Sequence, residues 1–272
     1  MNEHARHRGI YRIAVCMTLA LVVAAVVQAA VLSGAAHAAG LQAGAQAVSA
    51  QGGTVKMKVV SGWGSKQGYF DSSAKVSYLS NGLIKQVDAS VRQTDGGGYT
   101  SADKTKYTYS ADKLTKTTFT DGGSGTKSVT SIKYDGKGRM KTVKGDYASS
   151  TYAYDGDGLV KTRKGYSDGK LMQTDAYAYN ARGDLVKVKQ SQENPAPKAL
   201  TMSYKHTYKD GTIGKTKVTY KPSTYATLTL TYSYTTVEVP KSYVKAVKSQ
   251  HRNLMQSQFR VFTASSIYPT QA

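Results

Sequence analysis

Apolar and aromatic residues alternate with polar residues over most of the chain, from about Val55 to Val239. The alternation is cleanest over residues 228–234, where leucines and tyrosines take every second position and threonines and a serine lie between them. A period of two places alternate side chains on opposite faces of a β-strand. The pattern therefore predicts antiparallel strands with one buried face and one face in water.

One phrase recurs within this alternation: a large apolar or aromatic residue, one residue, a tyrosine, a short polar turn and then an apolar residue. Residues 132–140, 152–160 and 177–185 carry the phrase in full. Repetition of this kind indicates a repeat architecture. We expect one tyrosine in each unit to be a structural anchor that pairs across strands; these anchors are Tyr78, Tyr109, Tyr134, Tyr154, Tyr179 and Tyr208.

Turn signals separate the units. Asp-Gly pairs begin at Asp95, Asp121 and Asp168, and such pairs between alternating segments favour β-hairpins. The chain is therefore expected to be all-β, an antiparallel β-hairpin repeat meander. Because strand twist accumulates, we expect it to form a curled single sheet or an open half-barrel. Apolar residues at helical spacing over 241–255 predict a short C-terminal helix that caps the sheet.

The segment Ile132–Met140 resembles the tyrosine–aspartate (YD, or RHS-type) repeats of bacterial surface and secreted proteins. The units of Tyr154 and Tyr179 match part of the same motif, so the resemblance is centred on residues 130–190. In large members of that family, such repeats form curled β-sheets that can wrap around cargo. The resemblance implies a β-repeat fold and a bacterial surface or secreted protein.

The N-terminal segment has the composition of a signal peptide. Three arginines precede an apolar run over residues 13–32, and Ala36-His37-Ala38 supplies the small residues of a cleavage site. We expect cleavage between Ala38 and Ala39. A retained N-terminal anchor is the alternative, since the apolar run approaches the length that spans a bilayer. No later apolar run is long enough, so no transmembrane segment is expected after cleavage.

The expected organisation follows from these segments. Residues 1–38 form the signal peptide, and the small, polar residues 39–54 form a flexible linker. The YD-like β-repeat domain spans residues 55–239, and a C-terminal helix and tail span 240–272. The one cysteine, Cys16, lies in the signal segment, so we expect a mature chain without disulfides.

Charge narrows the choice of partner. The chain has 37 Lys and Arg against 17 Asp and Glu, a formal net charge of +20, and lysine dominates. Lysine is a hydrated point charge, whereas arginine suits bidentate reading of bases and phosphates. The balance favours diffuse attraction to an anionic envelope polymer or extracellular polysaccharide over sequence-specific nucleic-acid binding. Lysines that protect sheet edges from pairing are the alternative explanation.

Candidate catalytic residues are scarce. Beyond the signal segment the histidines are His206 and His251, and we interpret both as structural. Many aspartates precede glycine, which turn chemistry explains. The run Asp155-Gly156-Asp157-Gly158 looks like the start of a calcium loop, but apolar residues follow it where further oxygen ligands are needed. We therefore expect no enzyme activity, no catalytic residue, no metal and no cofactor.

Aromatic residues outside the anchors are the candidates for partner contacts, because they are large, rigid and amphipathic. Four tyrosines near inter-hairpin turns and one tryptophan between glycines make up this set: Tyr99, Tyr147, Tyr166, Tyr225 and Trp63.

Three functions stay open. The first is a secreted, non-enzymatic, envelope-associated protein that binds or organises anionic cell-wall or extracellular polymers. The second is a carrier of a lipid or other hydrophobic ligand in the concave face of a curled sheet. The third is a secreted enzyme or toxin. The sequence leaves the oligomeric state open.

Overall fold

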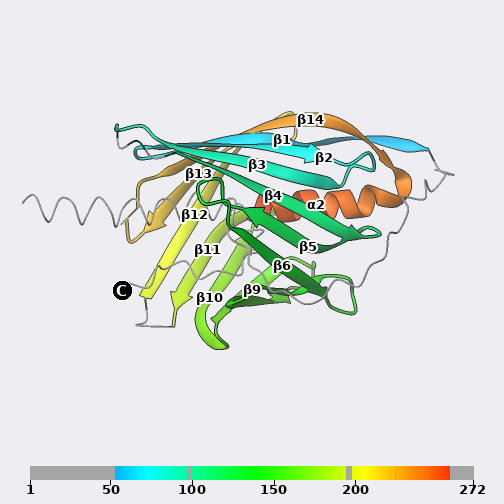
Figure 1. The fold of residues 1–272 in the computed structure, drawn as a ribbon. Helices are drawn as coiled ribbons and strands as arrows, with labels where there is room; N and C mark the ends of the chain where they lie inside the picture. Colours follow the sequence, from blue (N-terminus) through cyan, green and yellow to red (C-terminus); the bar gives the residue numbers. More distant parts are fainter. Residues whose placement is uncertain (1–52, 97, 99, 194–197, 224, 258–272) are drawn as a thin grey trace, which may run out of the picture.

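A computed structural model describes residues 53–257 except 97, 99, 194–197 and 224 (Figure 1). The chain forms fourteen strands, a 3₁₀ turn and a helix: β1 (Thr54–Gln67), β2 (Phe70–Tyr78), β3 (Ile84–Gln93), β4 (Thr100–Ser110), β5 (Lys113–Thr120), β6 (Lys127–Tyr134), β7 (Met140–Lys144), β8 (Ala148–Tyr154), β9 (Val160–Ser167), β10 (Lys170–Tyr179), β11 (Leu185–Gln192), β12 (Lys198–Lys209), β13 (Thr212–Lys221), β14 (Leu228–Pro240), η1 (Lys241–Tyr243) and α2 (Val244–Ser257). The expected signal peptide and tail lie outside the described residues, and so does the expected linker as far as residue 52.

The strands form a closed antiparallel barrel (Figure 1). Each strand pairs with its neighbours in the sequence, and β1 pairs with β14 from Thr54–Pro240 to Lys66–Thr229. The expectation of a curled single sheet or open half-barrel is therefore wrong. An open concave face, which the carrier hypothesis required, does not exist in a sheet whose first and last strands pair.

A seventh repeat, split between the chain ends, explains the closure. In the hairpin of β6 and β7, Tyr134 lies opposite Met140 and the register shifts just before the tyrosine. The other five hairpins repeat this geometry at their own anchors. In the β14–β1 pair, Tyr234 lies opposite Val60 and the register shifts between Val60 and Gly62. Tyr234 is thus a seventh anchor, whose partner strand lies at the other end of the sequence.

The anchors form a ladder of hydrogen bonds around the barrel. Six of the seven anchor hydroxyls donate to the carbonyl of the residue opposite the preceding anchor: Tyr78 to Val60, Tyr109 to Ile84, Tyr134 to Leu114, Tyr154 to Met140, Tyr179 to Val160 and Tyr234 to Ile213. Tyr208 departs from the rule and donates to Asp184 at 2.7 Å. Burial raises the pKa of Tyr134 and of Tyr234 to about 12, so both remain protonated donors at neutral pH.

The residue after the anchor shapes the turn. Oδ1 of Asp135 accepts hydrogen bonds from the backbone N–H groups of Lys137 and Arg139, at 2.9 Å each. Asp155 and Asn180 make the same pair of contacts in their own turns. Gly138 then takes a φ of 74°, a conformation that favours glycine. Turn geometry therefore explains why aspartate follows the anchor tyrosine, and the carboxylate of Asp155 stabilises such a turn.

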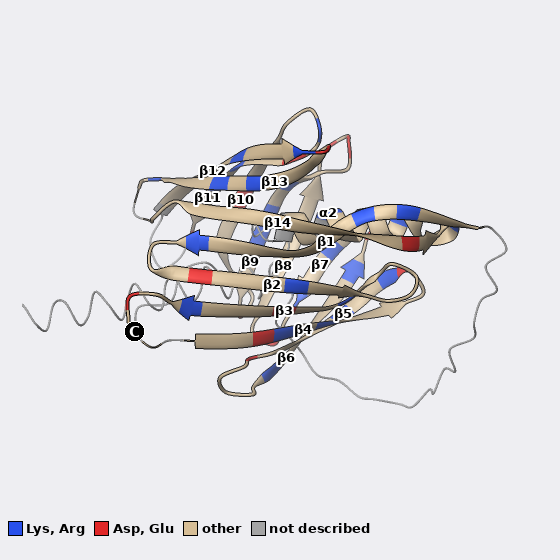
Figure 2. Ribbon diagram, turned by 90° about the horizontal axis from the view of Figure 1, so that it is seen from above, with Lys and Arg blue, Asp and Glu red and all other residues tan. Residues whose placement is uncertain are grey.

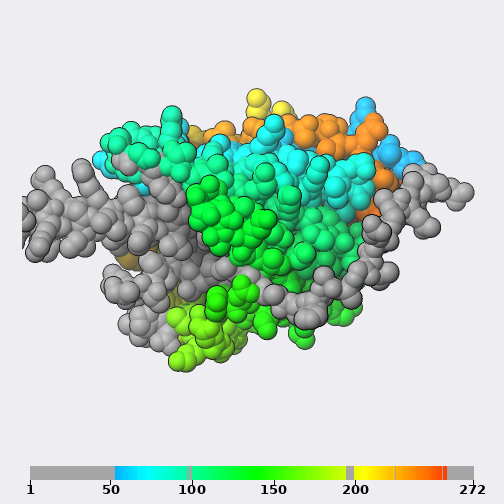
Figure 3. Space-filling view, in the orientation of Figure 1, coloured from blue at the N-terminus to red at the C-terminus, as the bar shows by residue number. Residues whose placement is uncertain are grey.

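The barrel interior and exterior differ in composition. The interior holds a large apolar cluster that includes Trp63, Val188 and Leu230, together with buried polar residues. Lysine and threonine occupy outward positions, for example the exposed Lys189 and Lys217. Figure 2 shows blue basic positions on many of the strands, and Figure 3 shows the continuous wall of side chains over β2–β5.

Helix α2 occupies the end of the barrel at which the repeat turns lie (Figure 1). Val247 packs against Val59, Leu83 and Val239, while Leu254 and Met255 join the main interior cluster. The helix begins three residues later than expected, because η1 first reverses the chain after β14. Within the described residues, no helix has the length and apolar character needed to cross a membrane.

The ladder leads to a stability prediction. The substitution Tyr154→Phe removes the 2.6 Å hydrogen bond to the Met140 carbonyl and keeps the ring. We expect the free energy of unfolding to fall by about 0.5–1.5 kcal/mol in urea denaturation. The control is Tyr147→Phe, since Tyr147 is 74% exposed in a turn and should tolerate the change. Equal effects of the two substitutions would contradict the ladder's role.

Candidate functional site

Two neighbouring polar residues fix α2 to the barrel wall. The backbone N–H of Val60 donates to Nε2 of His251 at 3.0 Å, and that of Ile84 donates to Oε1 of Gln250 at 3.3 Å. The same Oε1 lies 3.0 Å from the hydroxyl oxygen of Tyr109, whose shorter contact is the 2.7 Å hydrogen bond to the Ile84 carbonyl. Val60 and Ile84 both lie beside register shifts, where irregular pairing leaves donors without a ladder partner. The helix therefore docks at defined points of the repeat.

Docking leaves one groove on each side of the helix. Groove A has a volume of about 560 Å³ and is lined by α2, by β1 near Lys58, and by the turns that precede β11 and β13. Groove B has a volume of about 260 Å³ and is lined by α2 and the turns that precede β5, β7 and β9. Both grooves lie at the same mouth of the barrel, among the turns that the repeat produces.

The two grooves are strongly basic. Among the described residues that line it, groove A carries four cations, Lys58, Arg182, Lys248 and Arg252, and one carboxylate, Asp184. The described lining of groove B carries five cations, Lys113, Lys137, Arg139, Lys245 and Arg252, and one carboxylate, Asp112. Within residues 53–257 as described, Arg139 is the one member of this set that forms an ion pair, at 2.8 Å from Asp135. The remaining cations are available to an anionic ligand.

Aromatic rings hold two of the guanidinium groups in place. The guanidinium carbon of Arg182 lies 4.5 Å from the ring centroid of Tyr208, and that of Arg139 lies 4.4 Å from the ring centroid of Tyr154. Cation–π contact with a ring face orients a planar guanidinium and leaves its edge donors free. A guanidinium held in this way suits carboxylate or phosphate groups.

Two histidines line groove A, and both have structural contacts. The ring of His206 contacts the Leu185 carbonyl through Nε2 at 2.7 Å and the Thr216 hydroxyl through Nδ1 at 2.9 Å. Burial lowers the pKa of His251, which favours the neutral ring that accepts from Val60. These contacts agree with the structural interpretation of both residues.

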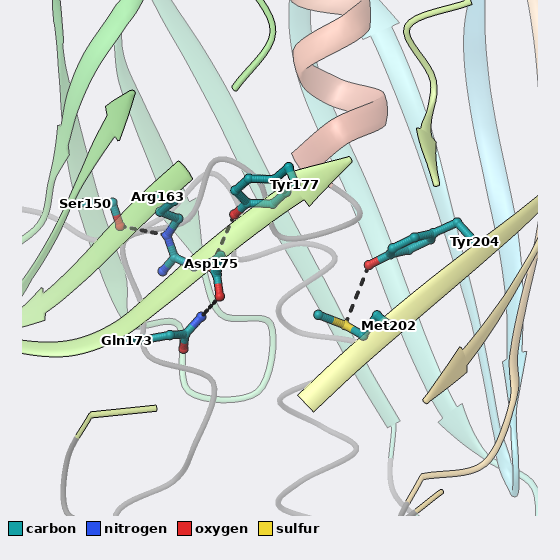
Figure 4. A network of polar contacts seen from close by, with 7 residues as sticks. All are labelled: Ser150, Arg163, Gln173, Asp175, Tyr177, Met202 and Tyr204. Atoms are coloured by element: carbon teal, nitrogen blue, oxygen red, sulfur yellow. Dashed lines mark hydrogen bonds and ion pairs between the residues drawn. The ribbon is translucent and has the colours of Figure 1, made fainter. Parts of the chain in front are cut away.

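A buried ion pair lies inside the barrel (Figure 4). Arg163 Nη1 and Asp175 Oδ2 are 2.7 Å apart, and both side chains are almost fully buried. Asp175 also accepts hydrogen bonds from Gln173 and Tyr177, and Arg163 donates to Ser150. Burial disfavours the charge on Arg163, but the adjacent Asp175 together with Tyr177 and Tyr152 outweighs it, and the pKa of the guanidinium is raised. This network links the buried sides of β8, β9 and β10 in the barrel interior.

The four described aromatic residues that were predicted to contact a partner do not line either groove. Tyr147 is exposed in the turn between β7 and β8, and Tyr166 is half-buried on β9. The ring of Tyr225 packs 5.3 Å from that of Tyr220, while Trp63 is 4% exposed in the core. Tyr99 lies outside the described residues. The structure does not bring this set together into one surface.

Sequence reasoning missed the residues of the grooves. Arg139 and Arg182 belong to repeat turns, and Lys248 and Arg252 belong to the terminal helix, so no local motif links them. The available signal was the position of arginines in repeat turns of a lysine-rich chain, together with a basic helix after the last strand. Among the described residues, no cluster of His, Cys, Asp and Glu has the arrangement of a metal site.

Comparisons with known proteins give distant structural likenesses. No family model and no curated protein matches the chain. A porin-like protein from Bacteroides uniformis is 13% identical, with a TM-score of 0.43 over 65% of this chain and 96% of that one. A porin-like protein from Bacteroides vulgatus is 10% identical, with a TM-score of 0.32 over 65% and 98%. The TcdB2-TccC3-Cdc42 complex contains a chain that is 13% identical, with a TM-score of 0.26 over 58% and 11%. At these scores we transfer neither fold nor function.

Proposed function

We propose that the protein is a secreted, envelope-associated, non-enzymatic bacterial protein that binds an anionic cell-wall or extracellular polymer. The observation that carries the proposal is the set of cations in the two grooves beside α2, of which all but Arg139 are without an ion pair among the described residues. The signal-like N-terminus and the lysine-rich composition support export and attraction to anionic surfaces. The barrel mouth is the binding site in this proposal, and the outer lysines add long-range attraction.

The chemistry of the grooves supports binding over catalysis. The described lining of each groove contains one carboxylate, and in groove A that carboxylate accepts a hydrogen bond from Tyr208. Both histidines at groove A are engaged with the barrel wall. The remaining polar groups are mainly lysine and arginine side chains, which attract anions and position them. Carboxylate or phosphate groups of a polymer would face the lysines and the edge of the stacked Arg182 guanidinium.

The test is a pull-down of the purified protein with bacterial cell wall, before and after removal of the anionic wall polymers, over a salt series. We expect binding that requires the anionic polymer and weakens steeply with salt, since exposed charges are screened. The variant Arg182→Ala/Lys248→Ala/Arg252→Ala should bind about 10- to 100-fold more weakly, because an exposed charge pair at 4 Å in water contributes about 1 kcal/mol.

A matched control separates the mouth from general charge. Lys164→Ala/Lys189→Ala/Lys217→Ala removes the same number of charges from exposed positions on β9, β11 and β13. This control should lose much less affinity than the groove variant. Equal losses would move the binding site from the mouth to the outer surface. Absence of binding at low salt would refute the proposed function.

A further inference from the structure

We propose that one anionic chain crosses α2 and places charged groups in groove A and groove B at the same time. This inference rests on the proposed function and specifies its ligand. The ligand would be an oligomer with carboxylate or phosphate groups repeated along it, long enough to pass over one helix. A single small anion would fill one groove.

The first argument is the duplicated arginine platform. Arg182 lies over Tyr208 in groove A, and Arg139 lies over Tyr154 in groove B. The repeat turn between these two platforms carries Leu159, whose side chain lies 3.9 Å from where a Cβ would stand at Gly183, and the carboxylates of Asp155 and Asp157. The two oriented guanidiniums thus lie on separate repeat turns with no cation of the intervening turn between them, which suits a ligand with spaced charges better than one compact anion.

The second argument is the arrangement of charge on α2. Lys248 lines groove A, Lys245 lines groove B, and the exposed Arg252 lines both. The helix therefore supplies a cation to each side and one at the crossing between them. A chain that passes over α2 near Arg252 meets positive charge continuously from one groove to the other.

The two grooves differ in strength. Arg139 shares its charge with Asp135 through contacts of 2.8 Å from both Nε and Nη2, whereas Arg182 is unpaired within the described residues. Groove A is also the larger of the two. We therefore assign the primary contact to groove A and the second contact to groove B. Joining two contacts in one ligand raises the overall affinity by about 10²–10⁴-fold over one contact alone.

Calorimetric titration with ligands of increasing length tests the inference. One series uses galacturonate and its linear oligomers, and the other uses inorganic phosphate, tripolyphosphate and long-chain polyphosphate. We expect the affinity to rise at least about 100-fold from monomer to the longer members. The series that shows the rise tells whether carboxylates or phosphates are the preferred groups.

Variants of each groove locate the two contacts. Arg182→Ala/Lys248→Ala changes groove A, Lys137→Ala/Lys245→Ala changes groove B, and Lys189→Ala/Lys217→Ala is the control on the outer wall. Either groove variant should weaken the long oligomer and flatten the dependence on length, with the groove A variant also weakening the short ligands. The control should retain the dependence. Circular dichroism verifies that each variant is folded.

The possible failures are distinct. Affinity that does not depend on length overturns the two-groove inference and leaves anion binding in place. A long oligomer that binds the groove B variant as tightly as the unmodified protein also overturns it. Absence of binding by every member of both series overturns the inference and the proposed function together.

Discussion

The substitution Asp175→Asn is expected to lower the free energy of unfolding by about 3–5 kcal/mol. Arg163 and Asp175 are 0% and 1% exposed, so their charges meet each other in place of water. The amide of asparagine keeps the shape of the carboxylate but removes its charge, which leaves the guanidinium of Arg163 buried and uncompensated. Urea denaturation, followed by fluorescence of the single tryptophan Trp63, measures the loss.

Two comparisons make this prediction specific. Asp71→Asn changes the exposed pair with Lys66, whose charged atoms are 3.8 Å apart, and should cost at most about 1 kcal/mol. Arg163→Met/Asp175→Leu replaces the whole buried pair with apolar side chains and should recover much of the loss, since no lone charge remains. A loss below about 1 kcal/mol for Asp175→Asn would show that Arg163 is hydrated or finds another partner.

The second large effect is expected at His251. The substitution His251→Ala removes the acceptor of the Val60 N–H, and Val60 is 0% exposed. An unsatisfied buried donor costs about 1–3 kcal/mol, and we expect a loss of this size at neutral pH. His251→Gln supplies an amide oxygen that can accept in place of the ring and should restore part of the stability.

Acid provides an independent test of the same contact. The folded pKa of His251 lies below its ordinary value of 6.5, so the unfolded chain binds a proton more readily than the folded one. The histidine therefore stabilises the fold fully above pH 6.5, and this stability falls as the pH drops from 6.5 toward the folded pKa. Denaturation curves should show this decline in the unmodified protein and lack it in His251→Gln. The same pH dependence in both proteins would contradict the assignment.

The sequence predicted those structural features that depend on residues close together in the chain. Alternation predicted strands, and the Tyr-Asp phrase marked turns in which Asp135 and Asp155 hold the backbone. The helix after the last strand was also visible as apolar spacing. These features depend on residues a few positions apart, so a reading of short segments captures them.

Closure and the grooves were not predictable in this way. Tyr232-x-Tyr234 begins the repeat phrase, but the strand that completes it starts near Val60, at the other end of the sequence. A search for an apolar residue a few positions after each tyrosine finds six units. It misses the seventh, because the apolar residue that completes that unit precedes the tyrosine by most of the chain. The grooves likewise combine turns of separate hairpins with α2, and only the closed barrel brings Arg182 and Arg252 to one place.

The split seventh repeat also constrains the order in which the molecule is completed. Thirteen strand pairs, the six repeat hairpins among them, join strands that are neighbours in the sequence, whereas the β1–β14 seam joins residues about as far apart as the barrel allows. Distant pairing is slow because a long loop must close first. A chain that folds from its N-terminus onward therefore keeps β1 as a free edge until β14 is in place. Helix α2 comes next, so the mouth and its basic grooves exist only after the seam has formed.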